Sequence, residues 1–372
     1  MGKRNADSFD QEMMARALRL ARRGEGYVEP NPMVGCVIVK NSKIIGQGYH
    51  RRFGGPHAEI VALRSCKKPP TGATVYCTLE PCTHFGKTPP CVDSLIDTGV
   101  ARVVIPILDP NPQVHGRGAR KLRRAGIKVE VGVMADEAAE LIRPFATRTL
   151  LDRPYVIAKW AQSANGFLIP GPGEPRWISG VESRRRVHQL RARVDAIMVG
   201  AGTVLKDDPL LTARGVRVKR VATRIIVDGR LRIPVDCKLV RTAGKTPTVV
   251  VTTAQKVRSR KAKVLCEAGV LVAPCRARGG SIVLDDLLRL PELTGATNLL
   301  VEGGPALLNA FFRAGLVDEA HVYESPRKLH PRAPAAAVVK YGRVLPESIR
   351  TLRSGKDKLQ VLKFAPTQKR SV

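Results

Sequence analysis

The amino-acid sequence predicts an α/β protein of two domains, and three observations support this prediction. The chain has 372 residues, which favours two domains over one. Residues 1–150 alternate strand-like apolar runs with helical patterns, and a similar alternation restarts after the turn-like sequence LDRP at 151–154. We therefore expect a three-layer domain over residues 1–150, with helices covering a central sheet, and a second α/β domain over residues 151–372.

The first domain begins with a predicted helix and a hairpin. Ser8 and Gln11 fit a capping box, and apolar residues recur at helical spacing up to a helix end near Gly24. Two apolar strands around Asn41 and Ser42 then indicate a hairpin over residues 34–49. The later elements are helix 57–66, strand 73–79, helix 91–99, strand 101–107, helix 116–126 and strand 127–133.

The second domain contains more strands, most of them short and apolar. Strands are predicted at 154–161, 196–200, 223–229, 246–253, 269–273, 298–304 and 318–325, with helices at 182–194 and 304–316. The residues after about 355 are expected to hold one last strand before a basic end.

Composition excludes some classes of protein and leaves others open. No apolar run approaches the ~20 residues of a membrane span, and no signal-peptide pattern opens the chain, so we expect a cytoplasmic protein. Eight cysteines are spread along the chain, which favours reduced thiols or metal ligands over disulfides. The net charge of +31 suits anionic ligands, but aromatic residues are only 4% and do not alternate with basic ones, which disfavours nucleic-acid binding.

A histidine, a glutamate and two cysteines stand at junctions between the predicted elements. His57 begins one helix, and Cys82 and Cys91 flank the start of another. Three such ligands leave one position open on a tetrahedral zinc ion, as a zinc that activates water requires. Glu59 is placed to carry a proton from that water to a departing amine. Zinc deaminases have this arrangement as H-x-E followed by P-C-x-x-C.

Eight residues separate the two cysteines here instead of two, so alternatives stay open at this point. In one of them His57, Cys82 and Cys91 are ordinary packed residues. In another, His84 is a fourth ligand and closes a purely structural zinc site. The order of the four residue types favours the open site, and we expect His84 to contact substrate.

The motifs of the first half resemble those of a known family. They are EPNPMVGCVIVKN, GYH, PHAE, TLEPCTHFGKTPPC and DPNPQVHGRGARKLRRAGI. As a set, covering nearly all of residues 9–150, they look like the deaminase domain of the bifunctional riboflavin biosynthesis proteins of the RibD family, which has the P-C-x8-C spacing. The resemblance implies a cytidine-deaminase-like fold, one zinc ion bound by His57, Cys82 and Cys91, proton transfer by Glu59, and a place for Asn31 in the pyrimidine pocket.

The second half is similar to the reductase domain of the same family over about 154–323. Its motifs are VIAKWAQSANG, RWISG, RRRVHQLRARVDAIMVGAGTVLKDDPLLTAR and LLVEGGPALLNAFFRAGLVDE. The resemblance implies a dihydrofolate-reductase-like fold that uses NADPH. It places the cofactor near Ala161, Trp177, Thr203, Asp207, Gly304, Pro305, Ala306, Leu307, Leu308, Asn309 and Ala310, and the sugar phosphate near Arg191, Leu211, Arg214 and Glu302.

Without the resemblance, the residues of the second half give weaker signals. The turn at Gly303 and Gly304 before a helix suits a phosphate at the helix N-terminus, but such turns are common. Asp207, Asp208 and Arg214 lie in a segment that also fits a solvated loop. Of the residues that the resemblance places near the sugar phosphate, the two arginines Arg191 and Arg214 suit a phosphate monoester, because guanidinium groups pair with its oxygens.

Three positions depart from the family pattern in this half. Asn165 stands where the family usually has aspartate, Pro175 takes the place of a substrate-side serine, and SPRKLHPRAPAAA at 325–337 replaces a P-K-L-L-G stretch. The deaminase motif is complete by contrast. The departures motivate an alternative in which the chain is a deaminase only, with a degenerate reductase domain.

The sequence thus predicts a bifunctional enzyme of riboflavin synthesis. Its substrate would be a phosphorylated pyrimidine, deaminated by the first domain and reduced by the second with NADPH. We also expect a homo-oligomer, dimer or tetramer, and no membrane partner. A nucleic-acid deaminase or binding protein is a more remote alternative, and a structural-zinc interaction module is another.

Overall fold

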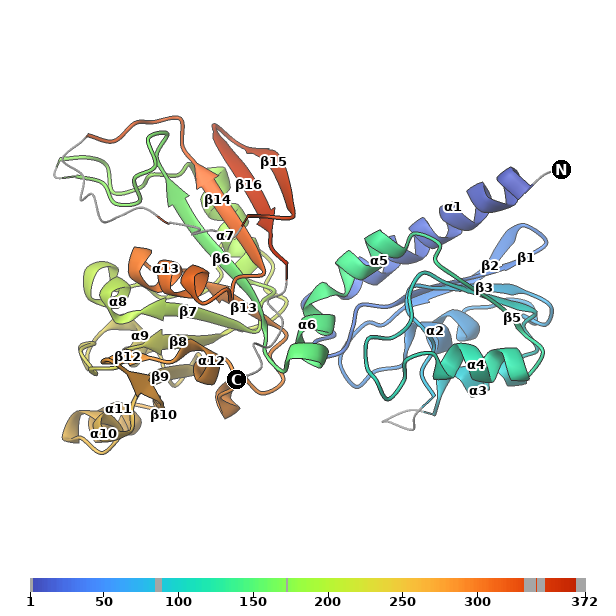
Figure 1. Ribbon diagram of the computed structural model, residues 1–372, viewed down its shortest axis with the longest axis horizontal. Coiled ribbons are helices and arrows are strands. Elements are labelled where there is room, and N and C mark those ends of the chain that lie inside the picture. The colour runs from blue at the N-terminus through green and yellow to red at the C-terminus, as the bar shows by residue number, and fades with distance from the viewer. Residues whose placement is uncertain (1–2, 84–88, 172, 331–338, 340–344, 366–372) are drawn as a thin grey trace. The chain divides into compact units, whose positions relative to one another are not determined.

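The computed structural model describes residues 3–83, 89–171, 173–330, 339 and 345–365, with side chains from residue 7 onward. The chain divides into two compact units, Met1–Leu150 and Leu151–Val372. Each unit has its own large sheet with helices on both faces, so the predicted α/β fold class is confirmed (Figure 1). In the described ranges, none of the helices is both long and apolar enough to cross a membrane.

The first unit is built on a five-stranded sheet with the order β2-β1-β3-β4-β5. The strands are β1 Gly35–Lys40, β2 Lys43–Tyr49, β3 Thr74–Cys77, β4 Arg102–Ile105 and β5 Lys128–Val131. Strands β1 and β2 form the predicted hairpin, and Asn41 and Ser42 in its two-residue turn have φ of 51° and 56°. Such positive φ angles match the twist of paired strands, so the turn chemistry fixes the hairpin.

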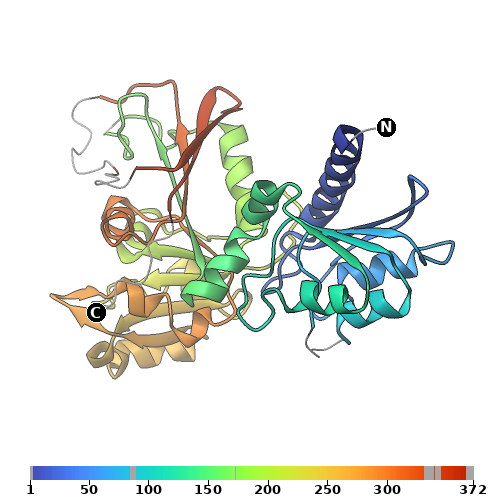
Figure 2. The same ribbon diagram turned by 45° about the vertical axis from the view of Figure 1, so that its right-hand side comes forward.

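Helices cover both faces of this sheet, as the three-layer prediction requires (Figures 1 and 2). They are α1 Lys3–Ala21, α2 Ala58–Arg64, α3 Cys91–Asp97, α4 Arg117–Arg124, α5 Ala135–Leu141 and, at the end of the unit, α6 Arg143–Leu151. Apolar side chains of α1 and α5 pack on one face, and those of α2, α3 and α4 pack on the other. The candidate zinc ligands therefore belong to the α2 and α3 face.

The predicted start of the first helix was wrong. Helix α1 begins at Lys3 and passes through Ser8, so Ser8 is a helical residue and no N-cap. The helix ends at Ala21 and a short 3-10 turn, Arg22–Gly24, continues it to the predicted end. A capping-box pattern also occurs inside helices, where the upstream residues are themselves able to be helical.

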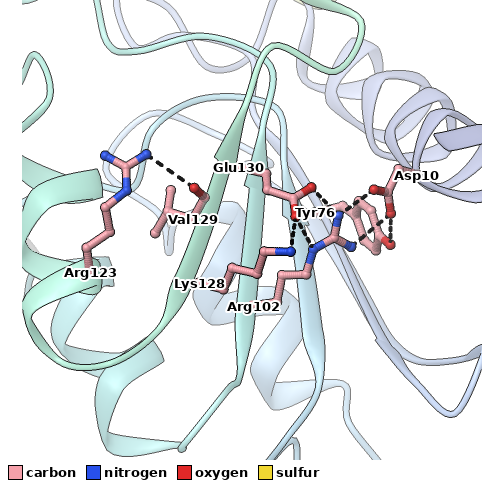
Figure 3. A network of polar contacts seen from close by, with 7 residues as sticks. All are labelled: Asp10, Tyr76, Arg102, Arg123, Lys128, Val129 and Glu130. Carbon is pink, nitrogen blue, oxygen red and sulfur yellow. Dashed lines mark hydrogen bonds and ion pairs between the residues drawn. The ribbon is translucent and has the colours of Figure 1, made fainter. Parts of the chain in front are cut away.

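A charged network joins α1 to the sheet (Figure 3). Arg102 on β4 donates to both carboxylate oxygens of Asp10 on α1, at 2.9 and 2.5 Å, and also pairs with Glu130 on β5. The Tyr76 hydroxyl donates to Asp10 at 2.6 Å, and Lys128 lies 2.7 Å from Glu130. One guanidinium thus connects the helix with two strands of the sheet.

The second unit is built on a nine-stranded sheet with the order β10-β9-β8-β7-β13-β6-β14-β16-β15. Its strands are β6 Tyr155–Gln162, β7 Ala196–Gly200, β8 Thr223–Val227, β9 Thr248–Thr253, β10 Leu271–Cys275, β13 Asn298–Val301, β14 Glu319–Glu324, β15 Ser348–Ser354 and β16 Asp357–Lys363. The strands from β10 to β14 run parallel, and β16 and β15 extend the sheet in antiparallel fashion. The predicted strands are confirmed, but β15 and the small hairpin of β11 Ala277–Arg278 and β12 Ser281–Ile282 were not predicted.

Helices also cover both faces of the second sheet. Leu308, Phe311 and Phe312 of α13 Pro305–Arg313 pack on one face, and Leu190 of α7 Val181–Arg191 packs on the other. The other helices are α8 Ala201–Asp207, α9 Lys238–Arg241, α10 Ala254–Val257, α11 Arg260–Glu267 and α12 Leu284–Leu287. Helices α8 and α13 follow the carboxyl ends of the neighbouring strands β7 and β13, where ligands of open α/β sheets commonly bind.

Candidate functional site

The structure brings His57, Cys82 and Cys91 together in the first unit. One ligand atom of each side chain lies within 4.8 Å of the other two. His57 Nδ1 is 3.2 Å from Cys91 Sγ and 3.5 Å from Cys82 Sγ. Imidazole and thiolate groups are common zinc ligands, and three protein ligands leave the fourth position of a tetrahedral zinc ion open. The donor set therefore fits a catalytic zinc ion.

Local backbone geometry positions these ligands. His57 immediately precedes α2, Cys91 is the first residue of α3, and Cys82 lies between β3 and α3. The Cys91 amide donates to Cys82 Sγ at 3.4 Å, and the Val92 amide donates to the Cys82 carbonyl at 3.3 Å. The start of α3 thus holds the second half of the motif together despite its longer spacing.

The protonation of the cluster is perturbed. The hydrogen bond from the Cys91 thiol, together with His57, lowers the pKa of Cys82 to about 4. Burial raises the pKa of Glu59, whose side chain is buried beside the cysteines. A thiolate is the form of cysteine that binds metals, so Cys82 is prepared as a ligand.

Asn31 lies beside the cluster and is held by His50. Pro56 offers only a carbonyl oxygen to His50 Nδ1, at 3.0 Å, so that nitrogen carries the proton. His50 Nε2 therefore accepts from the Asn31 amide at 3.1 Å. The His50 and His57 rings meet edge to face, 5.6 Å between centroids. Asn31 was predicted from the sequence, whereas the role of His50 was not, although His50 belongs to the GYH motif.

Glu80 is a second residue near the cluster whose role was not predicted from the sequence. Its buried carboxylate accepts from three backbone amides, those of Asp109 at 3.1 Å, Gly116 at 2.8 Å and Ala119 at 3.0 Å. Glu80 thus fastens the segment before Cys82 to the start of α4. A Cβ atom on Gly118 would lie 2.3 Å from the Pro81 carbonyl oxygen, so this close approach requires glycine.

The second unit contains a cavity of about 840 Å³, at the carboxyl ends of β6, β7 and β13. Its volume lies in the upper part of the range of ~300–1,000 Å³ for small-molecule sites. The cavity wall includes most of the residues assigned by resemblance: Ala161, Trp177, Thr203, Asp207, Gly304, Pro305, Ala306, Leu307, Arg191, Leu211, Arg214 and Glu302.

Three of the assigned residues lie away from the cavity wall. Leu308 is fully buried in the core under α13, and Asn309 and Ala310 follow it on the same helix. They are therefore not wall residues of the described cavity, and their contact with a cofactor stays a prediction.

Charged groups line the floor of this cavity. Arg191 donates to both carboxylate oxygens of Glu302, at 2.5 and 2.9 Å. Burial alone would raise the pKa of Glu302, but Arg191 and Lys159 outweigh it and lower that pKa. Burial lowers the pKa of Lys159, which faces both Glu302 and Arg191. Lys159 was not predicted from the sequence, although it lies in the motif VIAKWAQSANG.

The start of α13 has the features of a phosphate site. Gly303 and Gly304 precede the helix, and Thr203 Oγ1 accepts from the Gly304 amide at 3.2 Å. A Cβ atom on Gly303 would lie 2.9 Å from Leu307 Cβ, so a side chain there would require the helix to shift. Backbone amides at a helix N-terminus bind phosphates, which fits the diphosphate of a dinucleotide.

Trp177 and Leu211 have distinctive geometry on the cavity wall. Trp177 is 59% exposed, and the guanidinium groups of Arg176 and Arg184 lie 5.4 and 5.1 Å from its ring centroid. Leu211 is buried and has a φ of 52°, a conformation that costs a side-chain residue energy and commonly marks functional sites. Arg214 lies nearby, with its amide donating to His188 Nδ1 at 3.3 Å.

Of the three positions that depart from the family pattern, the structure describes Asn165, Pro175 and the first part of the stretch 325–337. Asn165 donates to the Leu329 carbonyl at 2.8 Å and accepts from the Leu329 amide at 3.0 Å. Pro175 is exposed and absent from the cavity wall. Residues 331–337 of the altered stretch and His84 lie outside the described residues.

Two family models match the two halves of the chain. The model described as the cytidine and deoxycytidylate deaminase zinc-binding region matches residues 7–107, and the RibD C-terminal domain matches residues 154–329. These matches identify the first unit as a zinc-binding deaminase domain and the second as a reductase domain of the NADPH-dependent RibD type.

Relatives and solved structures agree with both matches. The chain is 45% identical over 319 residues to the riboflavin biosynthesis protein RibD of Aquifex aeolicus, covering 86% of this chain and 87% of that one. It is 40% identical over 332 residues to the same protein of Escherichia coli, covering 86% and 88%. A structure of Acinetobacter baumannii RibD superposes with a TM-score of 0.83 at 34% identity, covering 96% of this chain and 99% of that one.

A structure from Thermotoga maritima extends the comparison. It is described as a diaminohydroxyphosphoribosylaminopyrimidine deaminase/5-amino-6-(5-phosphoribosylamino)uracil reductase. It superposes with a TM-score of 0.81 at 32% identity, covering 97% of this chain and 100% of that one. Identity of this extent over both units, with a zinc-type donor set in one and a cofactor-sized cavity in the other, establishes that the chain belongs to the RibD family of bifunctional riboflavin biosynthesis enzymes.

Proposed function

We propose that the first unit deaminates 2,5-diamino-6-ribosylamino-4(3H)-pyrimidinone 5′-phosphate, and that the second unit reduces the ribosyl group of the product to a ribityl chain. The observation that carries the first half is the convergence of His57, Cys82 and Cys91 within 4.8 Å. The name of the Thermotoga maritima relative supports the choice of substrate.

For deamination, we propose that His57, Cys82 and Cys91 hold the metal and Glu59 moves the proton. A zinc ion held by such ligands supplies a nucleophile at neutral pH by lowering the pKa of water. Glu59 lies two residues from His57, is buried, and belongs to the first turn of α2, where it cannot turn away into solvent. It would take a proton from the attacking water and deliver it to the leaving amine nitrogen. Asn31, held by His50, would orient the pyrimidine ring.

For reduction, we propose that the cavity of the second unit aligns a nicotinamide with the sugar. NADPH supplies the hydride that the ribose C1′ receives. The backbone amides of the first turn of α13, at Ala306 and Leu307, would bind the cofactor diphosphate, and Trp177 would pack against the cofactor. Arg214 would pair with the substrate phosphate, while Arg191 holds Glu302 toward the sugar.

The assembly and location of the chain belong to this proposal as well. We infer a homo-oligomer in the cytoplasm that acts on small molecules and has no nucleic-acid partner. All eight cysteines lie in described segments and are free thiols, which supports a reducing compartment. Size-exclusion chromatography with light scattering tests the oligomer.

The test of the function supplies zinc-loaded protein with the diaminopyrimidine ribotide and NADPH. Ammonia release and NADPH oxidation are followed in one sample. We expect ammonia first and then one NADPH per ammonia, with both lost in Glu59→Gln because the second unit acts on the product of the first. Ammonia without NADPH loss would favour the deaminase-only alternative, and unchanged activity in Glu59→Gln would favour a structural zinc.

A further inference from the structure

A second cavity in the first unit lies outside the candidate zinc site. It has a volume of about 620 Å³ and lies between β2, the loop that follows β2, and α2. Arg51 and Arg52 line it from the loop, and Arg64 lines it from α2. None of the residues that line it is acidic. Three arginine residues thus line one hollow whose volume suits a small molecule.

The positive charges around this cavity have no carboxylate partner among the described residues. In the described part of the chain Arg51, Arg52 and Arg64 make no ion pair, and the Arg51 guanidinium lies 5.7 Å from the centroid of the Tyr49 ring. Arg16 adds a further cation beside the wall, because its Nε donates to the Gln47 side chain at 2.9 Å.

Like charges that converge on a hollow raise its potential and favour an anion there. Guanidinium groups pair with the oxygens of phosphate through two parallel hydrogen bonds, which ammonium groups do not offer. Arg51 and Arg52 are adjacent in the loop and Arg64 belongs to α2, so the cavity collects arginines from two elements. The chemistry of the wall is therefore that of a phosphate site.

The cavity also has a fixed place relative to the candidate zinc site. Pro56 lines it and directly precedes His57. Val61 and Arg64 line it from α2, the helix that begins directly after His57. We propose that this arginine cavity binds a phosphate monoester. The phosphate comes either from the deaminase substrate itself or from a second phosphorylated small molecule, and the test separates these two sources.

The test reads the arginines directly in zinc-loaded wild-type protein, so it does not rest on the proposed function. An arginine-specific dicarbonyl reagent modifies the protein with and without saturating ribose 5-phosphate, at ionic strength matched with sodium chloride, and mass spectrometry follows each arginine. We expect Arg52 and Arg64 to react at least about fivefold more slowly with ribose 5-phosphate, because occupied sites are protected in proportion to ligand over Kd. Arg124, exposed on α4, is the control and should change less than about twofold. Equal protection of Arg124, or no protection of Arg52 and Arg64, overturns the proposal.

A variant then separates the two sources of phosphate. In Arg52→Gln/Arg64→Gln, protection of Arg51 should be lost. A rise of about tenfold in the KM for the diaminopyrimidine ribotide, at unchanged kcat, identifies the substrate phosphate as the ligand. An unchanged KM together with protection in the wild type identifies a second phosphorylated ligand. Arg124→Gln is the matched control variant. An equal rise of KM in this variant would show that the overall positive charge of the protein, and not the cavity, attracts the substrate, and would overturn the proposal.

Discussion

The two candidate sites are assembled in different ways. The zinc ligands come from residues 57 to 91, and the side chains are of types that bind metals strongly. The cavity of the second unit collects residues from Lys159 to Leu307, supplied by β6, α7, α8, α13 and the segments between them. Most of these are ordinary residue types, which we expect to act through shape and backbone amides. A site of rare side chains on short segments can be predicted from a motif, whereas a site of backbone and shape needs the fold.

The largest effect is expected when a zinc ligand is removed, and it tests whether the two sites are independent of each other. Cys91→Ala should abolish bound zinc and reduce ammonia release by about 10³-fold or more, because the nucleophile depends on the metal. Reduction of the purified deaminated intermediate should stay within about twofold, since the second site lies in a separate unit. Metal analysis and the two separate assays measure this. Cys66→Ala is the control, a half-buried cysteine of the same unit outside the cluster; parallel loss of both activities would contradict the separation.

The reciprocal change is expected to be smaller, because no single residue of the second cavity holds a metal. Glu302→Gln leaves Arg191 and Lys159 without their carboxylate partner in a buried setting. We expect kcat/KM for reduction to fall by about 10- to 100-fold with ammonia release unchanged. Steady-state kinetics of each half-reaction measure it.

The matched control for Glu302 is an arginine–carboxylate pair of the same unit on its surface. Arg276 donates to both oxygens of Asp286, and the Arg276 side chain is 72% exposed. Asp286→Asn should change reduction by less than about twofold, because exposed pairs contribute little. Equal effects in both variants would show that charge anywhere in the unit, and not the cavity, is responsible.

The elements predicted correctly from the sequence are those whose apolar residues recur with the period of a strand or a helix. Strand β15 was missed because its residues are mostly exposed and show no alternation of apolar and polar types, as an edge strand allows. The start of α1 was wrong because capping residues also occur within helices. Glu80 was missed because its partners are backbone amides at 109, 116 and 119, which no side-chain motif records. His50 was missed for a related reason, since its role depends on the Pro56 carbonyl and on Asn31 across a loop.

A third test concerns the stability of the first unit, which carries the zinc ligands, and leaves both candidate sites unchanged. Arg102→Gln removes the cation between Asp10 and Glu130, leaving the mostly buried Asp10 carboxylate beside Tyr76 alone (Figure 3). We expect the first unit to lose about 2 kcal/mol at pH 7, less than for a fully buried pair because Arg102 and Glu130 are partly exposed. Hydrogen exchange of the backbone amides of α1 measures the free energy of unfolding of this unit. Both tryptophans lie in the second unit, so their fluorescence should be unchanged.

The effect of Arg102→Gln should depend on pH with a defined sign. The hydrogen bond from Arg102, with Lys128, lowers the pKa of Glu130 to about 2 from an ordinary 4.5. A lowered pKa stabilises the folded state fully above the ordinary value, and that stabilisation disappears as pH falls through the folded pKa. The gap between wild type and Arg102→Gln should therefore be widest above pH 4.5 and shrink toward pH 2. A gap that is constant over this range would assign the loss to packing instead of charge.

The smallest effect concerns the departure at position 165. In the structure the Asn165 amide donates to the Leu329 carbonyl and accepts from the Leu329 amide, and Ser163 Oγ donates to the same Asn165 oxygen at 2.7 Å. Aspartate keeps both acceptor roles but has no group to donate, and its charge would face the Leu329 carbonyl. Asn165→Asp should therefore cost about 1 kcal/mol locally, and because Asn165 is absent from the cavity wall the KM for NADPH should change by less than about twofold.

The opposite result for Asn165→Asp would be as informative. A rise in kcat of tenfold or more would mean that the family aspartate serves reduction directly and that this chain has lost it, in favour of the deaminase-only alternative. Pro175→Ser is the control for the second departure, and because Pro175 is exposed and absent from the cavity wall it should leave both KM values unchanged. Asn165 and Leu329 form a two-way pair that aspartate cannot make, so the departure is one that the local structure accommodates, and the reductase site is expected to be intact around it.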